Sequence, residues 1–480
     1  MLRAIISTLF VALALSGFAQ KEKYLPYLSA DTLIKSVYIL ASDSLEGRET
    51  GEPGQKKAAD YILQQFSSAG LRPGKDTAFL QSYNLVVKPS GGGHLNIGKK
   101  EARFLKDYFF FPGFADFSLE VKNIHPYCET ISLENKILLI TDEGDQKITK
   151  EKLKKGVDAG ASAAIVLLKE YEKAVENSEH RIQKAMVRLQ EEESRKGFPI
   201  LFVNQAFWDK SVGKDIRSDK LHFGCNGNIT CSTHDLKVPV SVSVQREDII
   251  TTGENVIAYY QGIKSETIVI TAHYDHLGII NDKIYYGADD NASGTAGIIS
   301  LSKSLGRALN DGLEGRSVMF IAFSGEEKGL LGSDYYINHP FVPLEKTYAN
   351  INTDMIGRRD KTHADSKPYI YVIGAGRISK DLQDATEKAN EPLGLELDYK
   401  YDDPKDPNRF YYRSDHYNFA RYDIPVVFFF NGVHEDYHKH TDTRDKILPE
   451  LMEQRVRLAY YLAWELMTRE GELKKNQVKE

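Results

Sequence analysis

From Asn255 onward the chain alternates short apolar runs with stretches in which apolar residues recur at helical spacing. The apolar runs lie at 268–271, 318–323, 348–352, 369–373 and 426–430. They are nearly continuous, which is typical of strands buried on both faces. Helices are expected over 293–309 and 448–469. The alternation predicts an α/β fold with a mostly parallel central sheet flanked by helices.

The region before Asn255 has two different patterns. Residues 31–70 predict two helices around a polar loop, the second over 54–68 with Gly70 as a cap. Between 100 and 235, short apolar runs at 136–140, 163–168 and 198–203 predict strands, and the charged stretch 171–196 predicts a solvated helix or an arm. The chain is therefore divided into a discontinuous main domain, residues 20–98 and 240–480, and a smaller α/β insert, residues 99–239.

The N-terminus has the three parts of a secretory signal peptide. Arg3 is followed by the apolar run Ile5 to Leu15 and by small residues near Ala19. A membrane anchor or a buried helix is the alternative. No later stretch is long and apolar enough for a transmembrane helix. Residues 1–19 are therefore expected to be a signal peptide, and the protein to be exported to the periplasm or the extracellular space.

Composition narrows the class of protein only slightly. Of the 480 residues, 41% are hydrophobic and 27% charged, with a net charge of −6, so no nucleic-acid partner is expected. Export would permit a disulfide between Cys225 and Cys231, leaving Cys128 free. None of the three cysteines has metal-site spacing.

Five short polar segments follow predicted strands or lie in loops, where open α/β sheets place their sites. They are Thr271–His276, Gly287–Gly294, Phe323–Glu327, Asn352–Gly357 and Asp436–His438. Taken singly, each has an ordinary interpretation: a surface histidine, a helix N-cap cluster, a solvated turn, a hydrogen-bonded turn or a polar loop.

Taken together, the segments offer a ligand set for metal ions. The candidate ligands are His273, Asp290, Glu327, Asp354 and His438. Imidazole and carboxylate without thiolate suit zinc, with manganese or cobalt as weaker candidates. Five ligands are enough for two ions if one carboxylate bridges them. Glu326 is then left over as a candidate general base, and Asp275 could help orient His273.

The ordered segments resemble the di-zinc aminopeptidase family of the MH clan of metallopeptidases, and Leu45-Glu46-Gly47-Arg48-Glu49 resembles its N-terminal signature. The resemblance implies that His273 and Asp354 hold one zinc, that Glu327 and His438 hold the other, and that Asp290 bridges both. It assigns Glu326 as the general base, Asp275 as the partner behind His273, and Tyr437 as a group that polarises the substrate carbonyl. The insert is similar to a protease-associated domain.

The sequence departs from the family pattern after His438. Lys439-His440-Thr441-Asp442 stands where the family often has Thr-Pro, so His440, and after it His434, are alternatives to His438 as the ligand. His276 is expected to face solvent or to cap a turn and receives no role. Residues 412–416 either line the cleft or pack against the C-terminal helix.

The expected function is that of a secreted zinc-dependent aminopeptidase, which removes N-terminal residues from peptides by means of a metal-activated water. A carboxypeptidase of the same clan would have the same metals. A relative of the glutaminyl cyclase type would bind a single zinc, and a non-catalytic peptidase-like binding protein would use the fold without the chemistry.

Overall fold

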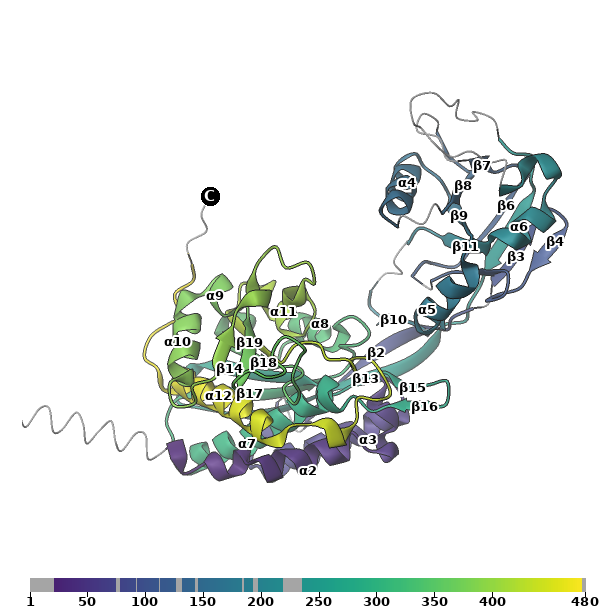
Figure 1. Cartoon of the computed structure of the whole chain (residues 1–480). Helices are drawn as coiled ribbons and strands as arrows, with labels where there is room; N and C mark the ends of the chain where they lie inside the picture. The colour runs from purple at the N-terminus through teal and green to yellow at the C-terminus, as the bar shows by residue number, and fades with distance from the viewer. Residues whose placement is uncertain are drawn as a thin grey trace, which may run out of the picture. The chain divides into compact units, whose positions relative to one another are not determined.

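The computed structural model describes residues 21–74, 78–91, 93–111, 113–126, 132–142, 146–183, 185–192, 197–218 and 235–476 (Figure 1). The expected signal peptide and Cys128, Cys225 and Cys231 lie outside the described residues. Contacts divide the chain into unit 1, Met1–Asn84 with Thr252–Glu480, and unit 2, Leu85–Thr251. The strands β2 (Leu80–Lys88) and β13 (Ile249–Tyr260) run through the two points of division.

The central strands of unit 1 form a parallel sheet. In spatial order they are β17 (Arg316–Phe323), β14 (Lys264–His273), β18 (Thr347–Thr353) and β21 (Val426–Phe430). Antiparallel neighbours border them: β13 pairs with β17, and β19 (Tyr369–Ile373) pairs with β21. The sheet as a whole is therefore mixed, and the expected parallel arrangement holds at its centre. The carboxyl ends of these four strands meet at one edge.

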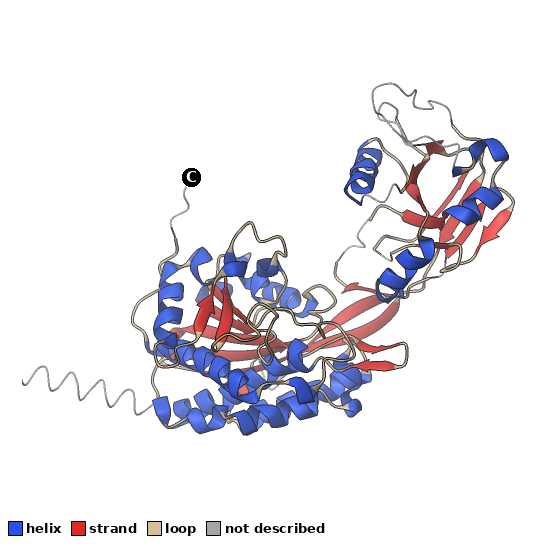
Figure 2. Cartoon of the chain, in the orientation of Figure 1, coloured by secondary structure: helices blue, strands red, loops and turns tan. Residues whose placement is uncertain are grey.

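Helices cover both faces of this sheet (Figure 2). One face packs against α2 (Ala30–Leu40), α3 (Pro53–Ser68), α7 (Gly294–Asn310) and α12 (Pro449–Thr468), and the other against α8 (Leu331–Asn338) and α11 (His416–Ala420). Successive side chains of a strand point to opposite faces. Ile268 and Ile270 of β14 accordingly join the first cluster, and Val269 joins the second.

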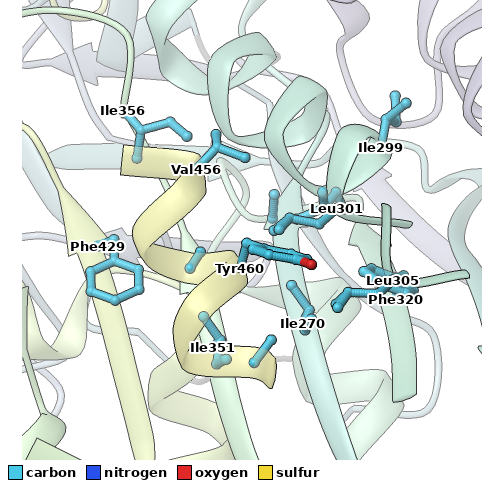
Figure 3. Close-up of a cluster of buried hydrophobic side chains, with 14 of the residues drawn as sticks. Ile270, Ile299, Leu301, Leu305, Phe320, Ile351, Ile356, Phe429, Val456 and Tyr460 are labelled. Atoms are coloured by element: carbon cyan, nitrogen blue, oxygen red, sulfur yellow. The ribbon is translucent and has the colours of Figure 1, made fainter. Parts of the chain in front are cut away.

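Figure 3 shows part of the first cluster, where Ile270, Phe320 and Ile351 of the strands face Leu305 of α7 and Tyr460 of α12. All five side chains are fully buried. Burying such side chains contributes roughly 1.5–3 kcal/mol each. The core therefore fixes the strand ends that carry the polar segments.

The described part of unit 2 contains two sheets. Its five-stranded sheet has at its centre the parallel strands β11 (Ile200–Asn204), β9 (Ala163–Leu168) and β8 (Ile137–Thr141), which match the three predicted apolar runs. They are flanked by β5 (Tyr108–Phe109) and β7 (His125–Pro126). The four-stranded sheet consists of β4 (Lys100–Ala102), β3 (Gly93–Ile97), β12 (Val240–Val244) and β6 (Phe117–Val121). Because β3 pairs with β12, the boundaries expected at 98/99 and 239/240 lie within unit 2.

The charged stretch 171–196 differs from its prediction. The helix α5 (Tyr171–Gln183) is followed by a strand, β10 (Met186–Leu189), which pairs antiparallel with Leu85–Lys88 of β2. The strand is only four residues long and is surrounded by charged residues, so the sequence shows no hydrophobic periodicity that would predict it. Among the described residues, no helix combines the length and the hydropathy that a bilayer span requires.

Candidate metal centre

The five predicted ligands converge at the carboxyl edge of the parallel strands. His273 is the last residue of β14, Glu327 follows β17, and Asp354 follows β18. Asp290 lies in the turn that opens α7, and His438 in the loop after β21. Two overlapping groups of potential ligand atoms result: His273 with Asp290 and Asp354, and His276 with Asp290 and Glu327.

Asp290 lies between the two groups. Its Oδ1 is 3.4 Å from Nε2 of His273, which is in turn 3.2 Å from Oδ1 of Asp354. Its Oδ2 is 3.1 Å from Nε2 of His438, which is 3.4 Å from Oε1 of Glu327. Each carboxylate oxygen of Asp290 therefore faces a different group, which is the arrangement that a bridging ligand requires.

The expectation for His276 is wrong, because its side chain is fully buried. Its Nδ1 lies 2.9 Å from Oε1 of Glu327 and 3.9 Å from Oδ2 of Asp290. An isolated backbone bridge joins residues 276 and 49 beyond the end of β14. The sequence contained one indication of this role, a second histidine in the segment His273-Tyr274-Asp275-His276. It was not recognised because residues three positions apart in an extended segment point to opposite faces.

The electrostatics of the cluster favour a cation. Burial raises the pKa of Glu326 well above its usual value, and repulsion by Glu327 and Asp354 adds to this effect, although His273 opposes it. Burial lowers the pKa of His438, but Glu327 and Asp290 overcome this and raise it to about 11. Protons on the histidines would thus neutralise the carboxylates in the place of metal ions. The donor set, imidazole and carboxylate, fits zinc.

Asp275 joins two of the segments. Its carboxylate accepts hydrogen bonds from the hydroxyl of Thr50 at 2.7 Å and from the backbone N–H of Glu326 at 3.2 Å. Nδ1 of His273 is closer to the backbone oxygen of Asp275, at 3.2 Å, than to its carboxylate, at 3.7 Å. Asp275 thus ties the segment of His273 to the segment of Glu326.

The alternative histidines contact residues other than the candidate ligands. His434 is buried, with Nε2 3.1 Å from the carboxylate of Asp289. His440 has its Nε2 3.4 Å from Nζ of Lys283. Of the three histidines considered as the ligand on this loop, His438 is the one placed against Asp290 and Glu327.

The segment resembling an N-terminal signature supports the centre through Arg48. This buried guanidinium donates to the backbone oxygens of Leu40, Tyr274, Tyr286 and Gly287, at 2.5 to 3.0 Å. Tyr274 follows His273, and Gly287 precedes the turn of Asp290. One side chain therefore holds two ligand segments together.

We expect Arg48→Met to lower the free energy of unfolding by about 3–5 kcal/mol, since it leaves several buried carbonyl oxygens without donors. Urea denaturation of the zinc-loaded protein measures this. Arg444→Met is the control: Arg444 is exposed, and within the described part of the chain it donates to one carbonyl, that of Tyr38. A loss below about 1 kcal/mol for Arg48→Met would show that the contacts do not matter.

A pocket opens beside the cluster. Its lining combines three carboxylates of the cluster with aromatic and apolar side chains and two cationic groups: Asp290, Glu326, Asp354, Met355, Phe410, Arg413, Phe428, Phe430, Tyr437 and His438. The ring of Tyr437 stacks on that of His438, with ring centroids 3.9 Å apart. The loop 412–416 contributes Arg413 to this lining, and the Ser414 hydroxyl donates to Asp354 at 2.7 Å. That loop therefore lines the cleft.

Comparisons with known proteins agree with this geometry. Residues 255–463 match the model of Peptidase family M28. They include all five candidate ligands, Glu326 and Tyr437.

Two curated relatives share part of the sequence. The chain is 32% identical over 149 residues to aminopeptidase YwaD of Bacillus subtilis, covering 30% of each chain. It is 29% identical over 227 residues to leucine aminopeptidase 1 of Sclerotinia sclerotiorum, covering 45% of this chain and 56% of that one. The chain thus spans less than two thirds of the length of these relatives.

Solved structures extend the likeness of fold over nearly the whole chain. An aminopeptidase from Aneurinibacillus sp. strain AM-1 superposes with a TM-score of 0.60 at 18% identity, covering 96% of this chain and 98% of that one. A zinc aminopeptidase from Bacillus subtilis gives 0.55 at 20% identity, covering 92% and 96%. These likenesses confirm the predicted α/β fold.

Proposed function

We propose that the protein is an exported, zinc-dependent aminopeptidase that removes N-terminal residues from peptides with water activated at a two-zinc centre. The observation that carries the proposal is the position of Asp290, which belongs to both groups of potential ligands and faces His273 with one carboxylate oxygen and His438 with the other. The fold shared with a zinc aminopeptidase and the match to peptidase family M28 support it.

The candidate ligands would bind the two zinc ions as follows. His273 and Asp354 would hold one zinc, Glu327 and His438 the other, and Asp290 both. Bound zinc lowers the pKa of water and polarises a carbonyl oxygen.

Glu326 lines the pocket without belonging to either group of ligands, so its carboxylate is available to accept the proton of the attacking water and to pass it to the leaving amine. Tyr437 would donate a hydrogen bond to the carbonyl oxygen of the scissile bond, where negative charge develops. The free N-terminus of the peptide would lie near the carboxylates.

The test combines metal analysis with blocked peptides. The purified mature protein should contain two zinc ions per chain and release the first residue of an unblocked or C-amidated leucyl hexapeptide. N-acetylation of that hexapeptide should abolish release. Cleavage of the N-acetylated peptide from its C-terminus would identify a carboxypeptidase instead. One zinc per chain, with no peptide hydrolysis, would favour a protein of the glutaminyl cyclase type.

The same preparation tests His276. We expect His276→Ala to weaken binding of the second zinc by about 10- to 100-fold, because the imidazole faces Glu327 either as a ligand or as a group that orients one. Competition with a chromogenic chelator measures the affinity. His440→Ala serves as the control because His440 lies against Lys283. Unchanged zinc affinity in His276→Ala would remove His276 from the centre.

A further inference from the structure

Arg413 is an exposed residue that lines the pocket beside the candidate metal centre. Its Nη2 donates to the hydroxyl oxygen of Tyr437 at 3.1 Å, and its guanidinium carbon lies 4.8 Å from the centre of the Phe410 ring. Among the described residues, no carboxylate is paired with it, whereas Arg421 on the same stretch of chain pairs with Asp334 at 3.1 Å. Arg413 therefore has donors free for an anion.

The hydrogen bond between Arg413 and Tyr437 has a fixed direction. Arginine can only donate, so the tyrosine oxygen accepts, and the O–H of Tyr437 remains available to a second acceptor. In the proposed reaction that acceptor is the carbonyl oxygen of the scissile bond. The guanidinium then lies within one residue of the bond that breaks.

The rest of the pocket indicates which side of that bond faces Arg413. The carboxylates would take the amine of the first residue, and Met355, Phe428 and Phe430, all at least 97% buried, offer apolar contact to its side chain. The second residue is left with the solvent-facing side of the pocket, where Arg413 is exposed. An anionic group on the second residue is the one that Arg413 can reach.

We propose that Arg413 binds a carboxylate on the second residue, and that this carboxylate is the free C-terminus of a dipeptide. The inference rests on the proposed aminopeptidase function and specifies its substrate. In a dipeptide, three bonds separate the scissile carbonyl carbon from the terminal carboxylate carbon, a span of about 4 Å. A guanidinium that holds Tyr437 with one N–H can pair with a carboxylate through its others. In a tripeptide the terminal carboxylate lies one residue further away.

The experiment compares kcat/KM of the zinc-loaded enzyme for Leu-Gly, Leu-Gly-amide and Leu-Gly-Gly. Wild type should prefer Leu-Gly over the other two by about tenfold or more, as expected for a charge-assisted hydrogen bond. In Arg413→Gln, the ratios of kcat/KM for Leu-Gly to kcat/KM for the other two substrates should be close to one. Arg421→Gln, which removes an exposed arginine outside the pocket, should leave them unchanged. A fourth substrate, Leu-Asp-amide, carries the carboxylate on the side chain; if it alone were preferred, the dipeptide assignment would be wrong.

The variant Tyr437→Phe tests whether Arg413 binds the substrate carboxylate or only positions Tyr437. It should lower all the rates by a similar factor and keep the preference for Leu-Gly. If Arg413→Gln lowered the rates for every substrate equally and left the ratios as in wild type, Arg413 would act only through Tyr437, and the carboxylate site would be disproved.

Calorimetry gives a readout that does not need turnover. In zinc-loaded Glu326→Gln, Leu-Gly should bind about tenfold or more tightly than Leu-Gly-amide, and Arg413→Gln added to that variant should remove the difference. Equal binding of the two ligands would overturn the proposal. Failure of the wild type to cleave any leucyl substrate would instead count against the aminopeptidase function, while the binding difference would still test Arg413.

Discussion

Glu326→Gln is expected to lower kcat by about 10²–10⁴-fold, the usual contribution of a general base, and to leave the zinc content of the protein unchanged. Glutamine has the shape of glutamate but cannot accept the proton. Glu326 belongs to neither group of ligand atoms, and its nearest approach to His273 is 3.9 Å. The substitution should therefore remove the proton acceptor while the residues that hold the metals remain.

The measurements are kcat on a leucyl chromogenic substrate and zinc per chain by plasma mass spectrometry. Glu435→Gln is a matched control, since Glu435 lies in the loop after β21 and its side chain is 78% exposed. Activity near that of wild type in Glu326→Gln would rule out the mechanism. Loss of zinc together with loss of activity would show that Glu326 is a ligand.

Asp290→Asn is expected to lower the activity as strongly as Glu326→Gln does, but through loss of bound metal. Because Asp290 faces both ligand groups, its carboxylate charge would contribute to both of the proposed ion sites, and its removal should bring zinc below one ion per chain. Metal ions supply several kcal/mol of transition-state stabilisation, so kcat/KM should fall by about a thousandfold or more.

Zinc titration by calorimetry separates this outcome from misfolding, provided that the far-ultraviolet circular dichroism of the variant matches that of wild type. Asp445→Asn, at an exposed carboxylate, is the control and should bind zinc as wild type does. If Asp290→Asn retained one tight zinc and lost only the other, Asp290 would serve one ion, and the bridging role would be withdrawn.

The patterns from 268 onward predicted the five strands β14, β17, β18, β19 and β21 and the helices α7 and α12, because buried strands and amphipathic helices leave distinct periodicities. Four of these strands are parallel, whereas β19 runs antiparallel to β21. The polar segments were then recognised because they follow the predicted strands or lie in loops. The structure brings their candidate ligands together: His273, Asp290, Glu327, Asp354 and His438. In this part of the chain the local pattern and the tertiary arrangement coincide.

The residues that the sequence did not reveal depend on contacts between distant loops. His276 lies against Glu327, which follows a different strand of the sheet. For residues 412–416 the sequence left two alternatives open, lining the cleft or packing against the C-terminal helix. The outcome depends on the contact of Arg413 with Tyr437, which joins two irregular segments 24 positions apart. The strand β10 was missed because it is short and forms only by pairing with β2.

The hydrogen bonds of Arg48 also constrain how the protein is made. They join residues that are 226 and 239 positions apart, and unit 2 is synthesised between them. Contacts of such sequence separation form late in folding because a long loop must close first. During biosynthesis the N-terminal helices therefore lack their final partners until the chain beyond Gly287 has emerged, so the candidate metal centre is completed only in the last stage of folding.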